Sequence, residues 1–209
     1  MAEPLHFALW LAVIGWLIAL LAVVAWYRQR RARRLLRAGI ERRLGVDVLT
    51  GLATRAGFLA RAEHEVNRSQ RAGHALSVLL VEVDDMRHIN AQYGHHGGDL
   101  ALRHVAEVCR AHVRDFDVCG RFSSQEIAIL LPDTKLVGAR KVLERIRQQV
   151  ATSSVQLEDG RSFPVGASIG VAELVSDVED AEDLLLAADG SLRRAKARRD
   201  DETDVLLGG

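Results

Sequence analysis

The feature that most constrains this 209-residue chain is an apolar run of 21 residues without a charge, from Phe7 to Tyr27. As a helix rising about 1.5 Å per residue it would span roughly 30 Å, the thickness of the hydrocarbon core of a bilayer. Trp10, Trp26 and Tyr27 lie towards its ends, where aromatic rings favour the membrane interface. No Lys or Arg precedes the run and no small-residue cleavage site follows it, so the sequence predicts a retained transmembrane helix rather than a signal peptide.

A block of arginines follows this run. Residues 28–43 hold eight arginines, and residues 1–43 hold only Glu3 and Glu41 as acids, although the whole chain has a formal net charge of zero. The positive-inside rule therefore places the rest of the chain in the cytoplasm. Because only the end beside the apolar run is basic, we do not expect nucleic-acid binding. The chain divides into a short tail (1–6), a transmembrane helix (7–27), a basic juxtamembrane linker (28–46) and a domain (47–207).

Helical and strand patterns alternate through this domain. A hairpin at 118–131 and two late strands favour antiparallel pairing, so we expect an α+β fold with a central, mostly antiparallel sheet flanked by helices. Cys109 and Cys119 have no metal-like spacing, and we interpret them as reduced. The expected helices are 54–71, 99–113, 135–150 and 181–199, and the expected strands are 76–83, 118–122, 127–131, 162–165, 167–174 and a last edge strand at 203–207.

Four stretches of the domain carry recognisable motifs. They are DVLTGLATRAGF (47–58), EVDDMRHINAQYGHHGGD (82–99), SSQEI (123–127) and a C-terminal stretch that includes Asp189 and Lys196. Their order and spacing resemble the GGDEF family of diguanylate cyclases over residues 47–207. The resemblance implies a nucleotidyl-cyclase-like sheet and a bacterial signalling role at the inner membrane.

In that family, two domains meet face to face, and each holds one GTP for the synthesis of cyclic di-GMP. Acidic residues hold two divalent cations that neutralise the phosphates and activate the attacking hydroxyl. The resemblance assigns guanine recognition to Asn90 and Asp99, metal binding to Glu82 and Gln125, and phosphate binding to Lys196. Asp84 matches the second acid of the same strand. Asn90 and Asp99 are also consistent with a local turn cap and a helix start.

The signature turn departs from the family pattern. Ser123 and Ser124 replace two glycines, so each position gains a Cβ that opposes positive φ and crowds a phosphate. Gln125 replaces a metal-binding acid with a neutral amide, a poor ligand for a hard dication, and only Glu126 persists. Glu82 is one methylene longer than the expected Asp, and Asp200 stands where an arginine is expected. Together these changes predict a degenerate GGDEF domain without cyclase activity, needing no cofactor; Mg²⁺ would matter only for residual activity.

A second nucleotide site is predicted from Arg114 and Asp117, which form an RxxD string six residues before the signature turn. In active family members this register carries the inhibitory site for cyclic di-GMP. Arginine pairs with phosphate or stacks on guanine, and aspartate accepts from the guanine edge. The alternative is a surface ion pair. We therefore expect a membrane-anchored cyclic di-GMP receptor, acting as a homodimer or with another signalling protein. A weakly active cyclase and a nucleotide-independent docking module remain as alternatives.

Overall fold

The computed structural model describes residues 45–207, with side chains up to Arg198, together with Trp16 and Val23 as single residues. The predicted tail, transmembrane helix and linker therefore lie almost wholly outside the described residues, and they remain predictions. Among the described residues, no helix is both long and apolar enough to cross a bilayer. Gly45–Gly209 forms one compact unit.

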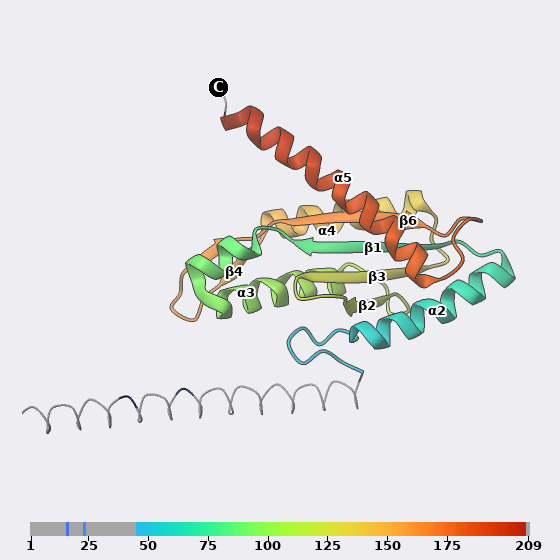
Figure 1. Cartoon of the computed structure of the whole chain (residues 1–209), viewed down its shortest axis with the longest axis horizontal. Helices are drawn as coiled ribbons and strands as arrows, with labels where there is room; N and C mark the ends of the chain where they lie inside the picture. Colours follow the sequence, from blue (N-terminus) through green and yellow to red (C-terminus); the bar gives the residue numbers. More distant parts are fainter. Residues whose placement is uncertain (1–15, 17–22, 24–44, 208–209) are drawn as a thin grey trace, which may run out of the picture. The chain divides into compact units, whose positions relative to one another are not determined.

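A four-stranded antiparallel sheet forms the centre of this unit (Figure 1). Its strand order is β2 (Val118–Arg121), β3 (Glu126–Pro132), β1 (Leu76–Val83) and β6 (Ala167–Glu173). β1 is the apolar sequence LSVLLVEV and pairs with β3 on one side and β6 on the other. The predicted α+β class and the predicted hairpin, β2 with β3, are confirmed.

Helices cover both faces of the sheet, because successive side chains of β1 point to opposite faces and nearly all of them are apolar. On one face Leu76, Val78 and Leu80 share a core with residues of α2 (Arg55–Ala72) and α5 (Ala181–Leu207). On the other face Leu79, Val81 and Val83 share a core with α3 (Met86–Ala111) and α4 (Leu136–Thr152). In Figure 1, α5 crosses the near face and α4 lies behind the sheet.

The two late strands do not pair with each other, contrary to the expectation from the sequence. β5 (Ser162–Pro164) pairs with β4 (Ser154–Gln156), a three-residue strand that was not expected, while β6 pairs with β1. Pro164 has no amide hydrogen to donate, and Gly166 lies two residues later, so the chain leaves one ladder before it enters the next.

Two helices also differ from the expected bounds. α3 begins at Met86 rather than at residue 99, and it is interrupted at Gly94 (φ 71°, ψ 176°), a backbone conformation that glycine tolerates. α5 continues to Leu207, so the predicted edge strand at 203–207 is wrong. No Gly or Pro stands between Gly190 and Leu207, and Ala, Arg, Lys and Glu favour a continued helix there.

The two cysteines are free thiols, as expected. Cys109 is buried in α3, and Cys119 is half-buried in β2. Burial raises the pKa of Cys119 to about 12 and also raises the pKa of Cys109. Both thiols therefore stay protonated and unreactive at neutral pH.

Candidate functional site

Glu82 and Gln125, predicted as vestigial metal ligands, are in contact. Gln125 Nε2 donates to Glu82 Oε1 at 2.9 Å. Lys196 of α5 reaches the same carboxylate, with its Nζ 2.6 Å from Glu82 Oε2. The Glu82 side chain is only 14% exposed, so a full positive charge beside it compensates for its desolvation. Both carboxylate oxygens are thus engaged by side chains of the protein.

Asp84 does not join this group. Its Oδ1 accepts a hydrogen bond from Ser168 Oγ of β6 at 2.7 Å, and the residue is buried. It lines a cavity between α4, β6 and α5, whereas Glu82 and Gln125 line a different cavity of about 570 Å³ at the start of α3. The two acids that the family resemblance assigns to cations therefore face different spaces.

The signature turn adopts a conformation that serine tolerates. Among the described residues, the non-glycine positions with positive φ are Asp85 and Asp133, so Ser123 and Ser124 are not strained. The Ser123 hydroxyl accepts from Gln125 N at 3.3 Å. The backbone of the signature turn thus does not require glycine at positions 123 and 124.

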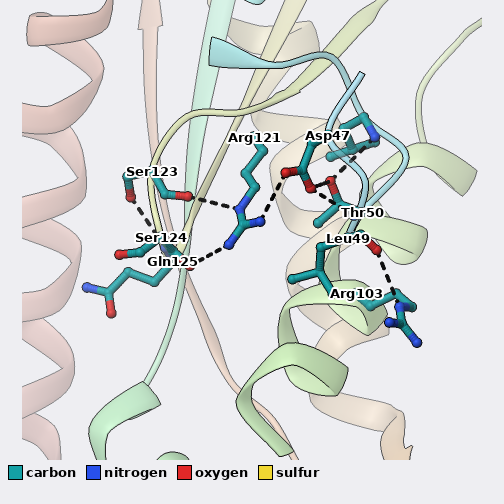
Figure 2. A network of polar contacts seen from close by, with 9 residues as sticks. Asp47, Leu49, Thr50, Arg103, Arg121, Ser123, Ser124 and Gln125 are labelled. Atoms are coloured by element: carbon teal, nitrogen blue, oxygen red, sulfur yellow. Dashed lines mark hydrogen bonds and ion pairs between the residues drawn. The ribbon is translucent and has the colours of Figure 1, made fainter. Parts of the chain in front are cut away.

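Arg121 holds this turn against an earlier part of the chain (Figure 2). Its Nε and NH2 donate to the carbonyl oxygens of Ser123 and Ser124 at 3.3 and 3.5 Å, and its NH1 donates to Asp47 Oδ2 at 3.0 Å. Burial raises the pKa of Asp47, but hydrogen bonds from Thr50 and the charge of Arg121 outweigh it, and the net pKa lies below its usual value. This link was not predictable from the sequence, because 74 residues separate Asp47 from Arg121.

Asn90 packs against Gly98, the residue that precedes Asp99. A Cβ on Gly98 would lie 2.3 Å from Asn90 Oδ1, so the amide of Asn90 packs directly over this glycine. Asn90 is half-buried and Asp99 is exposed. Their role in base recognition stays a prediction.

Arg114 and Asp117 form a tight turn after α3. Asp117 N donates to Arg114 O at 3.1 Å, and Arg114 N donates to Asp117 Oδ2 at 2.8 Å. The other oxygen, Oδ1, is buried and has no hydrogen-bond partner. Burial raises the pKa of Asp117, although Arg114 and Arg145 partly offset this effect.

The same two residues line a cavity of about 350 Å³. Lys141 and Arg145 of α4 also line it, and Arg145 donates to the carbonyl of His112. These cations are one helical turn apart, which places them on one face of α4. The four-residue spacing of Lys141 and Arg145 is visible in the sequence. No sequence signal near them, however, indicates that they line a cavity with Arg114.

Comparison with known proteins identifies the family. Residues 44–202 match the family described as "Diguanylate cyclase, GGDEF domain". The chain belongs to the GGDEF family. The resemblance stated from the motifs is thereby confirmed.

Individual relatives of this GGDEF domain are considerably longer. The chain is 34% identical over 159 residues to the diguanylate cyclase DgcP of Pseudomonas aeruginosa, and 35% identical over 152 residues to the response regulator PleD of Caulobacter vibrioides. These matches cover 76% and 72% of this chain but 23% and 34% of the relatives, so the chain spans about a quarter to a third of their length. The crystal structure of diguanylate cyclase SiaD with its activator SiaC, from P. aeruginosa, matches with a TM-score of 0.70 and 32% identity, covering 95% of this chain and 76% of that one.

The side chains of this GGDEF domain do not fit a magnesium site. Mg²⁺ demands oxygen ligands in nearly octahedral geometry. Here Glu82 is paired with a lysine, Gln125 turns an amide nitrogen towards that carboxylate, and Asp84 faces another cavity. Within the described part of the chain, no group of three or more His, Cys, Asp or Glu side chains is placed to hold a metal ion.

Proposed function

We propose that this chain is a membrane-anchored, degenerate GGDEF protein that has lost cyclase activity and acts as a receptor for cyclic di-GMP. Arg114 and Asp117 bind the ligand in this proposal, and Asn90, Asp99 and Lys196 belong to a vestigial GTP site. Residues 7–27 anchor the protein in the bacterial inner membrane. A change in how two domains pack, or in how one domain meets a partner, transmits the signal.

The loss of catalysis is supported by the contacts of Glu82. Phosphoryl transfer between two triphosphates depends on divalent cations to neutralise charge. Lys196 supplies one positive charge to Glu82 but cannot bridge phosphate oxygens while it is paired there. Gln125 has no charge with which to hold a second cation.

The receptor function depends on one observation above the others. The Arg114–Asp117 cavity contains a buried carboxylate oxygen, Asp117 Oδ1, without a hydrogen-bond partner. An unpartnered buried acceptor is costly, and a ligand that donates to it removes the penalty. Guanine offers N–H donors on one edge, and the phosphates of a cyclic dinucleotide match Arg114, Lys141 and Arg145.

Titration calorimetry tests this binding on the full chain in detergent. We expect saturable heat with cyclic di-GMP and at least about tenfold weaker binding by Arg114→Ala, because a charge-assisted contact to phosphate is lost. The matched control is Arg110→Ala, since this exposed arginine of α3 does not line the cavity. No heat from the parent protein would support the docking-module alternative instead.

A second assay tests the loss of catalysis. The full chain is incubated with GTP and either Mg²⁺ or Mn²⁺, and the products are separated by chromatography. We expect no cyclic di-GMP. The weak-cyclase alternative is favoured by the packing of Asn90 against Gly98, the residue before Asp99, and accumulating product would establish it.

A further inference from the structure

We infer that Phe116 is a stacking platform for a purine base at the rim of the Arg114–Asp117 cavity. This inference rests on the proposed receptor function and adds a residue that determines which ligands the site prefers. Phe116 is 57% exposed. By contrast, Phe58 and Phe163 are buried in the two cores, and Phe122 packs under Arg55 with the guanidinium 4.7 Å from its ring centre.

The turn fixes the position of this ring. Phe116 lies between Arg114 and Asp117, which are joined by two hydrogen bonds. Asp117 N donates to Arg114 O at 3.1 Å, and Arg114 N donates to Asp117 Oδ2 at 2.8 Å. The Arg114 guanidinium carbon lies 5.6 Å from the centre of the Phe116 ring. The ring thus lies beside Arg114, which lines the cavity, and an aromatic face and a guanidinium plane both accept a planar base.

The size of the cavity supports a contact outside it. At about 350 Å³ the cavity lies at the small end of the range for ligand pockets, roughly 300–1,000 Å³. A cyclic dinucleotide is a large ligand with two purine rings, so part of it extends past the rim. We place the edge of one base at Asp117 Oδ1 and the face of the exposed base on Phe116.

A single exposed apolar side chain is common on protein surfaces and needs no function. The test must therefore separate stacking from apolar contact. Phe116→Leu keeps the apolar volume but removes the π-face, and Phe116→Trp enlarges that face. Leu186→Ala is the control, because Leu186 is 65% exposed and belongs to α5 on the other face of the sheet.

We expect Phe116→Leu to bind cyclic di-GMP about tenfold more weakly than the parent chain in calorimetry, within the range for base–aromatic stacking. Phe116→Trp should bind as tightly or more tightly, and Leu186→Ala should match the parent. The urea midpoint of Phe116→Leu should be unchanged, because the ring is exposed.

Three results would overturn the inference. If the parent binds and Phe116→Leu binds equally well, Phe116 does not stack, and the receptor function stands without it. Weaker binding together with a lower urea midpoint would assign Phe116 a structural role. If the parent does not bind cyclic di-GMP at all, the receptor function fails and this inference fails with it.

Discussion

Lys196 Nζ lies 2.6 Å from Glu82 Oε2, so an ammonium group of α5 neutralises a carboxylate of the central strand. Gln125 donates to the other oxygen of that carboxylate. In a metal-dependent GGDEF domain the Glu82 position would face a cation. Here Lys196 places a positive charge against that carboxylate.

Replacing Lys196 tests how much its ammonium group stabilises the Glu82 carboxylate. Lys196→Met leaves a largely buried carboxylate without its cation, and we expect the free energy of unfolding to fall by about 1–3 kcal/mol. Arg193→Met on the same helix removes an exposed pair with Asp189 and should cost less than about 1 kcal/mol. Urea denaturation measures both; equal losses would show that the Lys196 pair has no special role.

Gln125→Glu should make the stability of the domain depend on divalent metal more strongly than that of the parent. The new carboxylate would lie beside Glu82, and like charges at hydrogen-bond distance repel, so we expect lower stability without metal. Mn²⁺ should then restore stability by binding the folded state. Thermal denaturation with and without Mn²⁺ checks this, with the parent as control; a variant insensitive to Mn²⁺ would contradict it.

Arg121→Ala should destabilise the domain, because it leaves the buried Asp47 carboxylate without its cation. We expect a loss of about 2–4 kcal/mol in unfolding free energy. Arg103→Ala is the matched control. Arg103 also donates to the segment that holds Asp47, at Leu49 O over 3.4 Å, but through an exposed contact (Figure 2). Its loss should be under about 1 kcal/mol.

The acid sensitivity of the domain should depend on the same Asp47. Its folded pKa lies below its usual value, so its contribution to stability is present above about pH 4 and is lost as the pH falls through the folded pKa. Asp47→Asn should therefore be less stable at neutral pH and lose less stability on acidification. Urea midpoints at pH 7 and pH 3 measure the difference. An equal loss of stability on acidification in the parent and in Asp47→Asn would contradict the prediction.

Asp117→Asn should separate binding from stability. Burial raises the folded pKa of Asp117, so its stabilising contribution is present at low pH and is lost as the pH rises through that pKa. Removing the charge should leave stability at pH 7 equal or higher, while cyclic di-GMP affinity falls at least about tenfold. Calorimetry measures the affinity and urea denaturation measures the stability. The control is Asp115→Asn, at the exposed neighbouring position.

Two glycines near α5 should respond oppositely to alanine. A Cβ on Gly170 of β6 would lie 2.2 Å from Ala188 O and 2.5 Å from Leu192 N, so Gly170→Ala must push α5 away and should cost about 3 kcal/mol or more. Gly190 of α5 has only Arg194 NH1 nearby at 3.6 Å, and Gly190→Ala should stabilise by about 0.5–1 kcal/mol. Urea denaturation measures both variants.

The family and the main elements were predictable because their signals are local. The apolar run of β1 and the motifs around Asp47 and Asn90 each lie within a few residues. Short or context-dependent elements were not predictable. β4 has three residues, and the fate of residues 203–207 depended on whether α5 stopped before them.

The sequence by itself determined the chemistry available at the signature turn: two serines and a glutamine in place of glycines and an acid, with Arg114 and Asp117 shortly before. Only the tertiary structure decided the partners of these groups. Lys196 is 114 residues from Glu82, and Lys141 and Arg145 line the same cavity as Arg114 because α4 packs beside it. Side-chain type is set by covalent structure, whereas a contact between distant residues exists only once the helices have packed on the sheet.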